Sequence, residues 1–252
     1  MSAASPIARV SGLVKVHGEP PSQLEVLRGI ELALAPGAFV CVMGPSGSGK
    51  STLLHLISGL DEPTAGTVEL DGQDLGRLSL GAKTLLRRRT VGYVFQFFNL
   101  LPNLSVQENV GLPLAIAGRP DGAATPSSDP VPALLQRFGI AARAHAFPHQ
   151  LSGGEMQRTS IARALAGAQP LLLCDEPTGN LSQAAGLEVM RALREVCDRD
   201  GRTVLLVTHN PRDATFADEV RFLLDGRIAD TVLGQEKLAI EDVHAALTKL
   251  SI

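Results

Sequence analysis

The residues FVCVMGPSGSGKSTLLHLISGL, 39 to 60, decide the fold class of this chain. The first five are apolar at consecutive positions, as in a strand that is buried on both faces. A glycine-rich loop follows, and the apolar residues after it recur with the period of a helix that ends near Gly59. We therefore expect a buried strand, a loop and a helix in direct succession, as at the start of an α/β fold.

The loop at 44–51 fits the pattern G-x-x-x-x-G-K-[ST] at every fixed position. In such a loop, backbone N–H groups and the positive end of the next helix dipole point at phosphate oxygens. Lys50 is expected to reach the β- and γ-phosphates, and the Ser51 hydroxyl to bind Mg²⁺. A structural turn would explain the glycines, but neither the lysine nor the hydroxyl. The loop alone predicts nucleotide binding, by Gly44, Pro45, Ser46, Gly47, Ser48, Gly49, Lys50, Ser51 and Thr52.

An acidic pair follows the apolar run LLLC at 171–174. The carboxyl end of a parallel strand faces the crevice in which such sheets bind ligands. We expect Asp175 to hold Mg²⁺ through water, and Glu176 to polarise the attacking water and accept its proton. The alternative is an acidic turn with Pro177 ending the strand, and the phosphate loop in the same chain argues against it.

Strand and helix patterns alternate along the chain, except that strand patterns vanish between about residues 97 and 166. This order predicts a largely parallel sheet that is interrupted by a helical insert. The elements expected after residue 96 are helices around Val106–Ala117, Val131–Phe138, Gly154–Ala166 and Ala184–Asp198, strands at 171–174 and 203–209, and a hairpin at Asp225–Gly226.

The residues LSGGEMQR, 151 to 158, contain a second glycine-rich turn. Ser152 and Glu155 have the spacing of a capping box, which would open a helix. A capping box does not explain the glycines Gly153 and Gly154, which would expose helix N-terminal amides as an anion site.

With this segment the chain resembles the ABC (ATP-binding cassette) transporter ATPase family, whose signature is LSGGQ followed by an arginine-containing helix. The resemblance implies that the signature of one subunit closes over the ATP held by the phosphate loop of a second ATP-binding subunit, in a head-to-tail dimer. The residues that it assigns to this contact are Leu151, Ser152, Gly153, Gly154 and Glu155.

Two further residues match motifs of the same family. Gln96 in VGYVFQ looks like the glutamine that senses Mg²⁺ and the membrane partner. His209 in VTHNP looks like the switch histidine, which holds the γ-phosphate and the attacking water. The resemblance thus implies catalytic roles for Glu176, His209 and Gln96, and Mg²⁺ binding by Ser51, Gln96 and Asp175, with ATP as the nucleotide.

The resemblance extends from about Val10 to Asp230 and implies the fold of the family. That fold is a P-loop core with a mixed, mainly parallel sheet, an N-terminal antiparallel β-subdomain and an inserted helical subdomain. We expect one ABC ATPase domain over 1–252, with the core and β-subdomain in about 1–96 and 167–252 and the helical subdomain in about 97–166.

Finer features look like the branch that serves lipoprotein release, macrolide or antimicrobial-peptide export, and FtsE-type cell division. They are VMGPSGSGKSTLLHLISGLDEPTAG, FNLLPNLSVQENV and DEPTGNLS. This implies an integral-membrane permease partner that holds the chain at the cytoplasmic face of the membrane. The apolar segment FFNLLPN, 97 to 103, is expected to contact the permease, to belong to the core of the helical subdomain, or both.

Three positions depart from the family pattern. His17 stands where an aromatic residue usually stacks on adenine. We expect that it either stacks on adenine with a smaller contact area or is an exposed loop residue. Ser182 replaces the usual final aspartate of the loop after the acidic pair, which is expected to slow or desymmetrise hydrolysis. The segment DGAATPSSDP, 121 to 130, reads as a flexible loop where a charged helix is usual.

Composition limits the alternatives. The net charge of -3 gives no reason to expect a nucleic-acid partner, and we read Arg87–Arg89 as a solvated loop or helix face. The three cysteines have no metal-type spacing and favour a reducing compartment. No apolar stretch is long enough to span a bilayer. A soluble ABC ATPase acting on nucleic acid is disfavoured, whereas mechanotransmission without transport remains open as an alternative to export.

Overall fold

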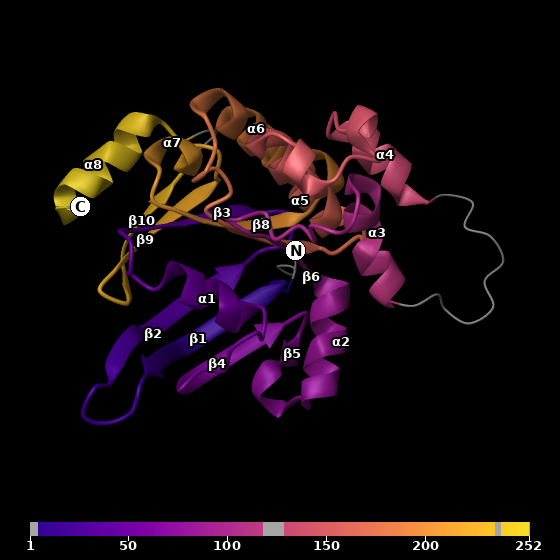
Figure 1. Cartoon of the computed structure of the whole chain (residues 1–252). Coiled ribbons are helices and arrows are strands. Elements are labelled where there is room, and N and C mark those ends of the chain that lie inside the picture. The colour runs from indigo at the N-terminus through magenta and orange to yellow at the C-terminus, as the bar shows by residue number, and fades with distance from the viewer. Residues whose placement is uncertain (1–4, 118–128, 235–237, 252) are drawn as a thin grey trace.

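The computed structural model describes residues 5–117, 129–234 and 238–251, and Figure 1 shows two sheets with helices above, between and beside them. The larger sheet has six strands in the order β10-β9-β3-β8-β7-β6. All neighbouring pairs are parallel except β9 and β10, which form the hairpin expected at Asp225–Gly226. These strands are β3 (Phe39–Met43), β6 (Val91–Val94), β7 (Leu171–Asp175), β8 (Thr203–Thr208), β9 (Glu219–Leu224) and β10 (Arg227–Leu233).

The smaller sheet is antiparallel throughout, in the order β2-β1-β4-β5. Its strands are β1 (Ala8–His17), β2 (Leu24–Leu34), β4 (Ala65–Leu70) and β5 (Gln73–Asp74). The predicted fold class, a mixed and mainly parallel sheet with an N-terminal antiparallel subdomain and inserted helices, is confirmed.

The helices predicted between residues 106 and 198 are present, with ends that differ by at most two residues. Helices α2, α7 and α8 were not expected. The helices are α1 (Lys50–Ile57), α2 (Leu80–Thr90), α3 (Val106–Ala117), α4 (Pro130–Arg137), α5 (Gly153–Leu165), α6 (Gln183–Asp200), α7 (Pro211–Ala214) and α8 (Ile240–Leu250). The part of 121–130 up to residue 128, expected to be a flexible loop, lies outside the described residues.

The central strands β3, β7 and β8 of the six-stranded sheet are buried on both faces, as the unbroken apolar run of β3 predicts, whereas the edge strand β10 is partly exposed. Phe39, Cys41 and Met43 point into a core formed with the helices α3 to α8. Val40 and Val42 point the other way, into a core formed with α1 and the antiparallel sheet. The strand that leads to the phosphate loop is therefore fixed from two sides.

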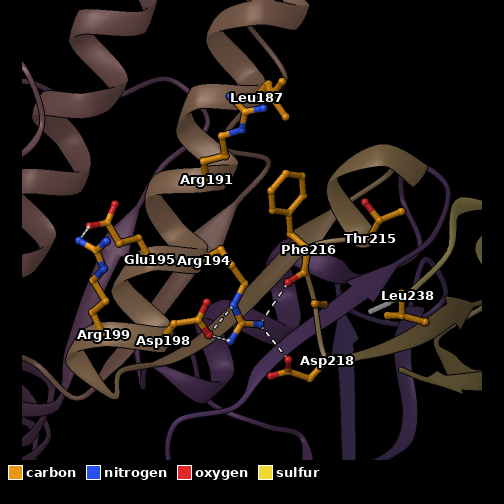
Figure 2. Close-up of a pocket in the computed structure, with 11 residues that line it drawn as sticks. Leu187, Arg191, Arg194, Glu195, Asp198, Arg199, Thr215, Phe216, Asp218 and Leu238 are labelled. Carbon is orange, nitrogen blue, oxygen red and sulfur yellow. Dashed lines mark hydrogen bonds and ion pairs between the residues drawn. The ribbon is translucent and has the colours of Figure 1, made fainter. Parts of the chain in front are cut away.

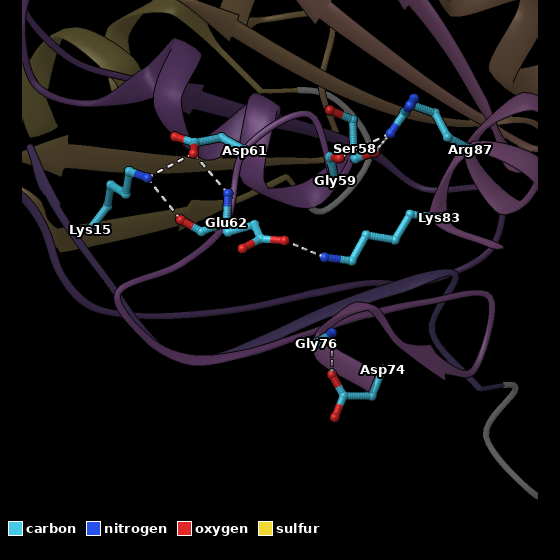
Figure 3. A network of polar contacts seen from close by, with 9 residues as sticks. All are labelled: Lys15, Ser58, Gly59, Asp61, Glu62, Asp74, Gly76, Lys83 and Arg87. Atoms are coloured by element: carbon cyan, nitrogen blue, oxygen red, sulfur yellow. Dashed lines mark hydrogen bonds and ion pairs between the residues drawn. The ribbon is translucent and has the colours of Figure 1, made fainter. Parts of the chain in front are cut away.

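Helix α1, which begins at the phosphate loop, is also fixed at its far end (Figure 3). Arg87 on α2 donates hydrogen bonds to the carbonyl oxygens of Ser58 at 3.4 Å and Gly59 at 2.9 Å. A guanidinium at this end suits the negative end of the α1 dipole. Of the predicted solvated arginines, Arg88 and Arg89 are exposed, but Arg87 is partly buried by this role.

The turn after α1 is held by two lysines from different elements (Figure 3). Lys15 of β1 donates to Asp61 Oδ1 at 2.7 Å and to the Glu62 carbonyl at 2.8 Å. Lys83 of α2 donates to Glu62 Oε1 at 2.6 Å. The antiparallel sheet, α1 and α2 are thus joined by polar contacts behind the phosphate loop.

Within the described ranges, every helix is too short or too polar to traverse a bilayer.

Candidate nucleotide site

The phosphate loop connects β3 to α1, and two of its glycines are required by the backbone. A Cβ on Gly44 would lie 2.1 Å from the carbonyl oxygen of Leu223 in the neighbouring strand β9. Gly49 has a φ of 103° as the N-cap of α1, and a Cβ there would lie 2.7 Å from Leu27. Side chains at these positions would force strand or loop apart.

Lys50 is buried in the loop, with 6% of its surface exposed. Its Nζ donates hydrogen bonds to the carbonyl oxygens of Gly44 and Pro45, both at 2.9 Å. The same atom lies 3.9 Å from Glu176 Oε1. Burial lowers the pKa of Lys50, and the neighbouring carboxylates oppose this effect. The ammonium group therefore lies between the loop and the acidic pair, where a terminal phosphate would meet both.

Ser48 supplies a further polar group to the loop. Its hydroxyl is buried, and it has no hydrogen-bond partner among the described residues. A buried hydroxyl is normally bonded. A phosphate oxygen in the loop would supply the partner, so the residues present fit a nucleoside phosphate.

Ser51 and Asp175 come together at the carboxyl end of β7. The Ser51 hydroxyl donates to Asp175 Oδ1 at 3.0 Å. Burial raises the pKa of Asp175, although the Ser51 hydrogen bond opposes the change. Hydroxyl and carboxylate oxygens are the ligands that Mg²⁺ prefers, so this pair fits the predicted magnesium position.

Glu176 forms the centre of the site. Its Oε2 lies 2.9 Å from Nδ1 of His209, and its backbone has a left-handed φ of 42°. The backbone N–H of Glu176 donates to the carbonyl of Val207, which ties the ends of β7 and β8 together. A left-handed backbone at a non-glycine residue costs energy and persists only where its surroundings impose it.

Gln96 lies against the loop that follows Glu176. A Cβ on Gly179 would be 3.3 Å from Gln96 Nε2 and 3.5 Å from Glu176 Oε2, so both side chains border this glycine. Asn180 also donates a hydrogen bond to the Gln96 carbonyl at 3.0 Å. The structure thus brings together Lys50, Ser51, Gln96, Asp175, Glu176 and His209.

His17 lies exposed at the end of β1, opposite Leu24 of β2. The next residues of β2 approach the loop, since Val26 lies 3.1 Å from the position of a Cβ on Gly49. This places the end of the antiparallel sheet beside the phosphate loop.

The signature segment forms the predicted capping box. Ser152 is the N-cap of α5 and accepts from the Glu155 N–H at 3.3 Å, while Glu155 Oε2 accepts from the Ser152 N–H at 2.8 Å. Arg143 also pairs with Glu155 at 3.0 Å. The Ser152 backbone hydrogen bond is the main cause that lowers the pKa of Glu155 to about 2. Leu151, before the cap, packs against the helical core.

The signature glycines have no positive φ. A Cβ on Gly153 would lie 3.2 Å from the end of the Leu181 side chain, and one on Gly154 would lie 3.4 Å from Ala185 Cβ. The nearest obstacles are side chains at the start of α6, not backbone. The fold of this chain therefore does not by itself require glycine at either position.

One pocket in the described residues is lined by none of the six residues that the site brings together (Figure 2). It has a volume of about 760 Å³ between α6 and the segment 215–218. Arg194 crosses it and bonds to Asp198 at 2.5 Å, Asp218 at 2.8 Å and the Phe216 carbonyl at 3.2 Å. A second pocket, of about 560 Å³, borders Glu176 and His209 and contains a buried aspartate, Asp213, that no sequence pattern singled out.

Comparisons with known proteins agree with this geometry. The family model described as ABC transporter matches residues 27–179. The lipoprotein-releasing system ATP-binding protein LolD 2 of Caulobacter vibrioides is 44% identical, over 89% of this chain and 97% of that protein. The corresponding LolD of Anaeromyxobacter dehalogenans is 47% identical, over 89% of this chain and 93% of that protein.

Two more relatives extend the comparison. The pyoverdine export ATP-binding/permease protein PvdT of Pseudomonas entomophila is 39% identical over 99% of this chain, which spans 39% of that longer protein. The solved dimer of the ATP-binding cassette MJ0796 in a post-hydrolysis state, bound to ADP and Pi, has a TM-score of 0.82. It is 36% identical over 90% of this chain and 98% of that chain.

Proposed function

The chain belongs to the ABC transporter family, and from that premise we propose that it is an ATP-hydrolysing subunit that powers export or extrusion of a substrate through a membrane permease. The observation that carries this proposal is the position of Glu176. Its carboxylate lies between the Lys50 ammonium, at 3.9 Å, and the His209 imidazole, at 2.9 Å. A carboxylate between a phosphate-binding cation and a second proton carrier is placed to act on a water that attacks the terminal phosphate.

Each residue has a distinct role in hydrolysis. Lys50 and the loop amides bind the β- and γ-phosphates, and Lys50 offsets the charge that builds up during transfer. Glu176 orients the water and accepts its proton as the bond from the water oxygen to the γ-phosphorus forms. His209 holds Glu176 through Nδ1 and leaves its other ring nitrogen for the γ-phosphate. ADP leaves as the bond between the γ-phosphorus and the bridging oxygen breaks.

The metal site follows from the same residues. Ser51 and Asp175, with Gln96 nearby, would hold Mg²⁺, which would neutralise charge on the phosphates when bound. The short contact between Ser51 and Asp175 supports this assignment, because both oxygens already face one position.

The signature segment acts on a second copy of the chain or a similar subunit. The capping box uses the N–H groups of Ser152 and Glu155, and the Met156 N–H donates to the Ser152 carbonyl, so none of these bonds uses the N–H groups of Gly153 and Gly154. Two amides at a helix N-terminus suit a phosphate. The dimeric ADP-bound relative supports an arrangement in which these amides face the nucleotide of the other subunit.

The permease partner is proposed to contact the segment 97–103. Phe97 is 70% exposed and Leu101 is 41% exposed, whereas Phe98 packs towards Gly153. The segment thus has an outward apolar part, which supports the permease contact, while none of residues 97–103 is fully buried in the core of the helical subdomain. Relatives named for lipoprotein release and pyoverdine export favour a lipophilic or peptide-like substrate, and a location at the cytoplasmic face of the membrane.

ATP hydrolysis by the full chain, with and without a candidate permease, tests the proposal. We expect phosphate release from wild-type protein, stimulation by the cognate permease, and retained ATP binding without release by Glu176→Gln. A wild-type rate equal to that of Glu176→Gln under both conditions would contradict the assignment.

A further inference from the structure

Asp213 is a buried carboxylate beside the candidate site. It lies in α7 with 5% of its surface exposed. Its Oδ2 accepts a close hydrogen bond from the Thr178 hydroxyl, and it lies 3.5 Å from the Thr208 hydroxyl. Thr178 follows Glu176 by two residues, and Thr208 directly precedes His209. One carboxylate therefore contacts both of the segments that carry the reacting pair.

Within the described residues, few contacts other than those of the sheet hold the Glu176 segment and the His209 segment relative to each other. The backbone bond from Glu176 to Val207 joins them at the ends of β7 and β8. Beyond it each segment turns on itself: the Gly179 N–H donates to the Glu176 carbonyl at 3.1 Å, and the Asn210 N–H donates to the Thr208 hydroxyl at 3.0 Å. The contact between Glu176 and His209 depends on both turns holding their positions.

Thr178 is fixed from two sides. Its hydroxyl bonds to Asp213, while its methyl group faces Gly186 of α6, where a Cβ would lie 3.5 Å from it. The segment after α7 is also tied to α6, because Arg194 bonds to the Phe216 carbonyl and to Asp218 (Figure 2). Thr178 therefore links Asp213 of α7 to α6, and Arg194 links the segment after α7 to the same helix.

Burial of a carboxylate needs a reason. Removing a charged group from water is costly unless hydrogen bonds replace the lost hydration, and an apolar side chain would fill the same volume without that cost. Asp213 receives its hydrogen bonds from the two segments of the reacting pair.

We propose that Asp213 is a positioning residue for ATP hydrolysis, which joins the Thr178 and Thr208 segments so that Glu176 and His209 meet. The inference rests on the proposed function, since it assigns a role in hydrolysis at Glu176. Asp213 touches neither nucleotide nor water in this role. It acts through the two threonines.

The test removes the hydroxyl of Thr178 without changing its shape. In the purified full chain, we expect Thr178→Val to lower kcat for ATP hydrolysis by about ten-fold or more, because small misplacements of reacting groups have large effects on rate. KM and ATP affinity should stay within about two-fold, since the phosphate loop is untouched. Thr178→Ser retains the hydroxyl and should recover most of the lost rate.

A second variant and a matched control complete the test. Asp213→Leu, which removes the acceptor, should lower kcat as well, and the double variant Thr178→Val with Asp213→Leu should be no slower than the slower single one, because both break the same contact. Thr215→Val removes another hydroxyl of this region, one that bonds only to the Arg212 carbonyl in the described structure, and should leave kcat unchanged.

The outcomes separate the inference from the proposed function. If wild-type protein hydrolyses ATP and both Thr178→Val and Asp213→Leu keep kcat within about two-fold, the inference is wrong and the proposed function stands. If serine fails to rescue, or if ATP affinity and thermal midpoint fall together with kcat, Asp213 is only structural and the inference is again wrong. If wild-type protein matches Glu176→Gln, the proposed function fails, and the inference fails with it.

Discussion

Two glycine-containing turns in this molecule each open a helix, and they differ in why they contain glycine. At the phosphate loop, Gly44 lies against the backbone of β9 and Gly49 has a left-handed φ, so the fold of the chain itself requires them. At the signature turn, Gly153 and Gly154 have no positive φ, and the nearest atoms that a Cβ would meet belong to side chains. A glycine that its own fold does not require indicates close approach by something outside the chain.

The polar groups of the two turns differ in the same way. The ammonium of Lys50 meets loop carbonyls and a carboxylate of its own chain. The Ser152 hydroxyl is engaged in the cap of α5, where it also donates to Glu155 Oε2 at 2.9 Å. The residues around the phosphate loop therefore come together within one chain, whereas the signature turn is a capped helix end that we propose completes the site of a second subunit.

The largest expected effect is on the residues around the phosphate loop, which come together within one chain. Glu176→Gln should lower ATP turnover by about 10²–10⁴-fold, because the amide cannot accept the proton of the attacking water. ATP binding should persist, since Lys50 and the loop are unchanged. Phosphate release and equilibrium nucleotide binding, measured on the same preparation, check both statements.

The next effect concerns the signature turn. Gly154→Asp should lower turnover by about 100-fold by placing a negative charge against the incoming phosphate, while stability is unchanged because a carboxylate suits a helix N-terminus. ATP affinity of the isolated subunit should also be unchanged. Turnover, nucleotide binding and thermal unfolding measure these effects, and a parallel loss of binding in the monomer would contradict a site shared between subunits.

Mixing two inactive variants sharpens the comparison. Lys50→Ala damages only the loop and Gly154→Asp only the signature, so a mixed head-to-tail dimer has one intact site. An equal mixture should recover about a quarter of wild-type turnover, because about half of the dimers are mixed and one of their two sites works. Lys50→Ala mixed with Glu176→Gln is the matched control. Both changes affect the same half, so no activity should return.

The free energy of unfolding distinguishes a glycine that lies against backbone, Gly44, from one that only has a left-handed φ, Gly72. Gly44→Ala should reduce the free energy of unfolding by about 3 kcal/mol, because its Cβ would meet the Leu223 carbonyl. Gly72→Ala, at a turn with a φ of 71° and open space, should cost only about 1 kcal/mol. Urea unfolding of both variants gives the two values, and equal losses would contradict the steric explanation.

The smallest expected effect lies on the adenine side. His17→Tyr should tighten ATP binding by about 2- to 10-fold, since a phenol ring offers more stacking area than an imidazole. Titration of ATP into both proteins measures this, with GTP as the control for base selectivity. Identical affinities would mean that His17 does not contact the base.

The sequence predicted the regular parts of this fold and the motifs of the site. Loop, acidic pair and capping box are encoded by neighbouring residues, so spacing alone reveals them. Pairing of β1 with β2 and β4 is a long-range property that alternation does not specify, and the family resemblance predicted only an antiparallel subdomain, not this strand order. Helix α2 was missed because LGAKTLLRRRT has few apolar residues at helical spacing, and Arg87 became part of the α1 end only through tertiary contact.

Asp213 shows the limit more clearly. It belongs to a four-residue helix, its partners lie 35 and 5 residues away, and no local pattern marks an aspartate as buried. The geometry of three segments is needed to reveal it.

Ser182 is a simpler case: it caps α6 by accepting from the Ala185 N–H at 3.4 Å, as an aspartate at an N-cap also would.

Helix α8 packs against the part of the chain that follows His209. It packs against α7, its Val243 and Ala246 share a core with Ala214, and Lys249 pairs with Asp230 of β10 at 2.7 Å. The matched family region ends at residue 179, well before this helix. Helix α8 therefore helps to hold the segment that follows His209, although it lies outside the matched family region.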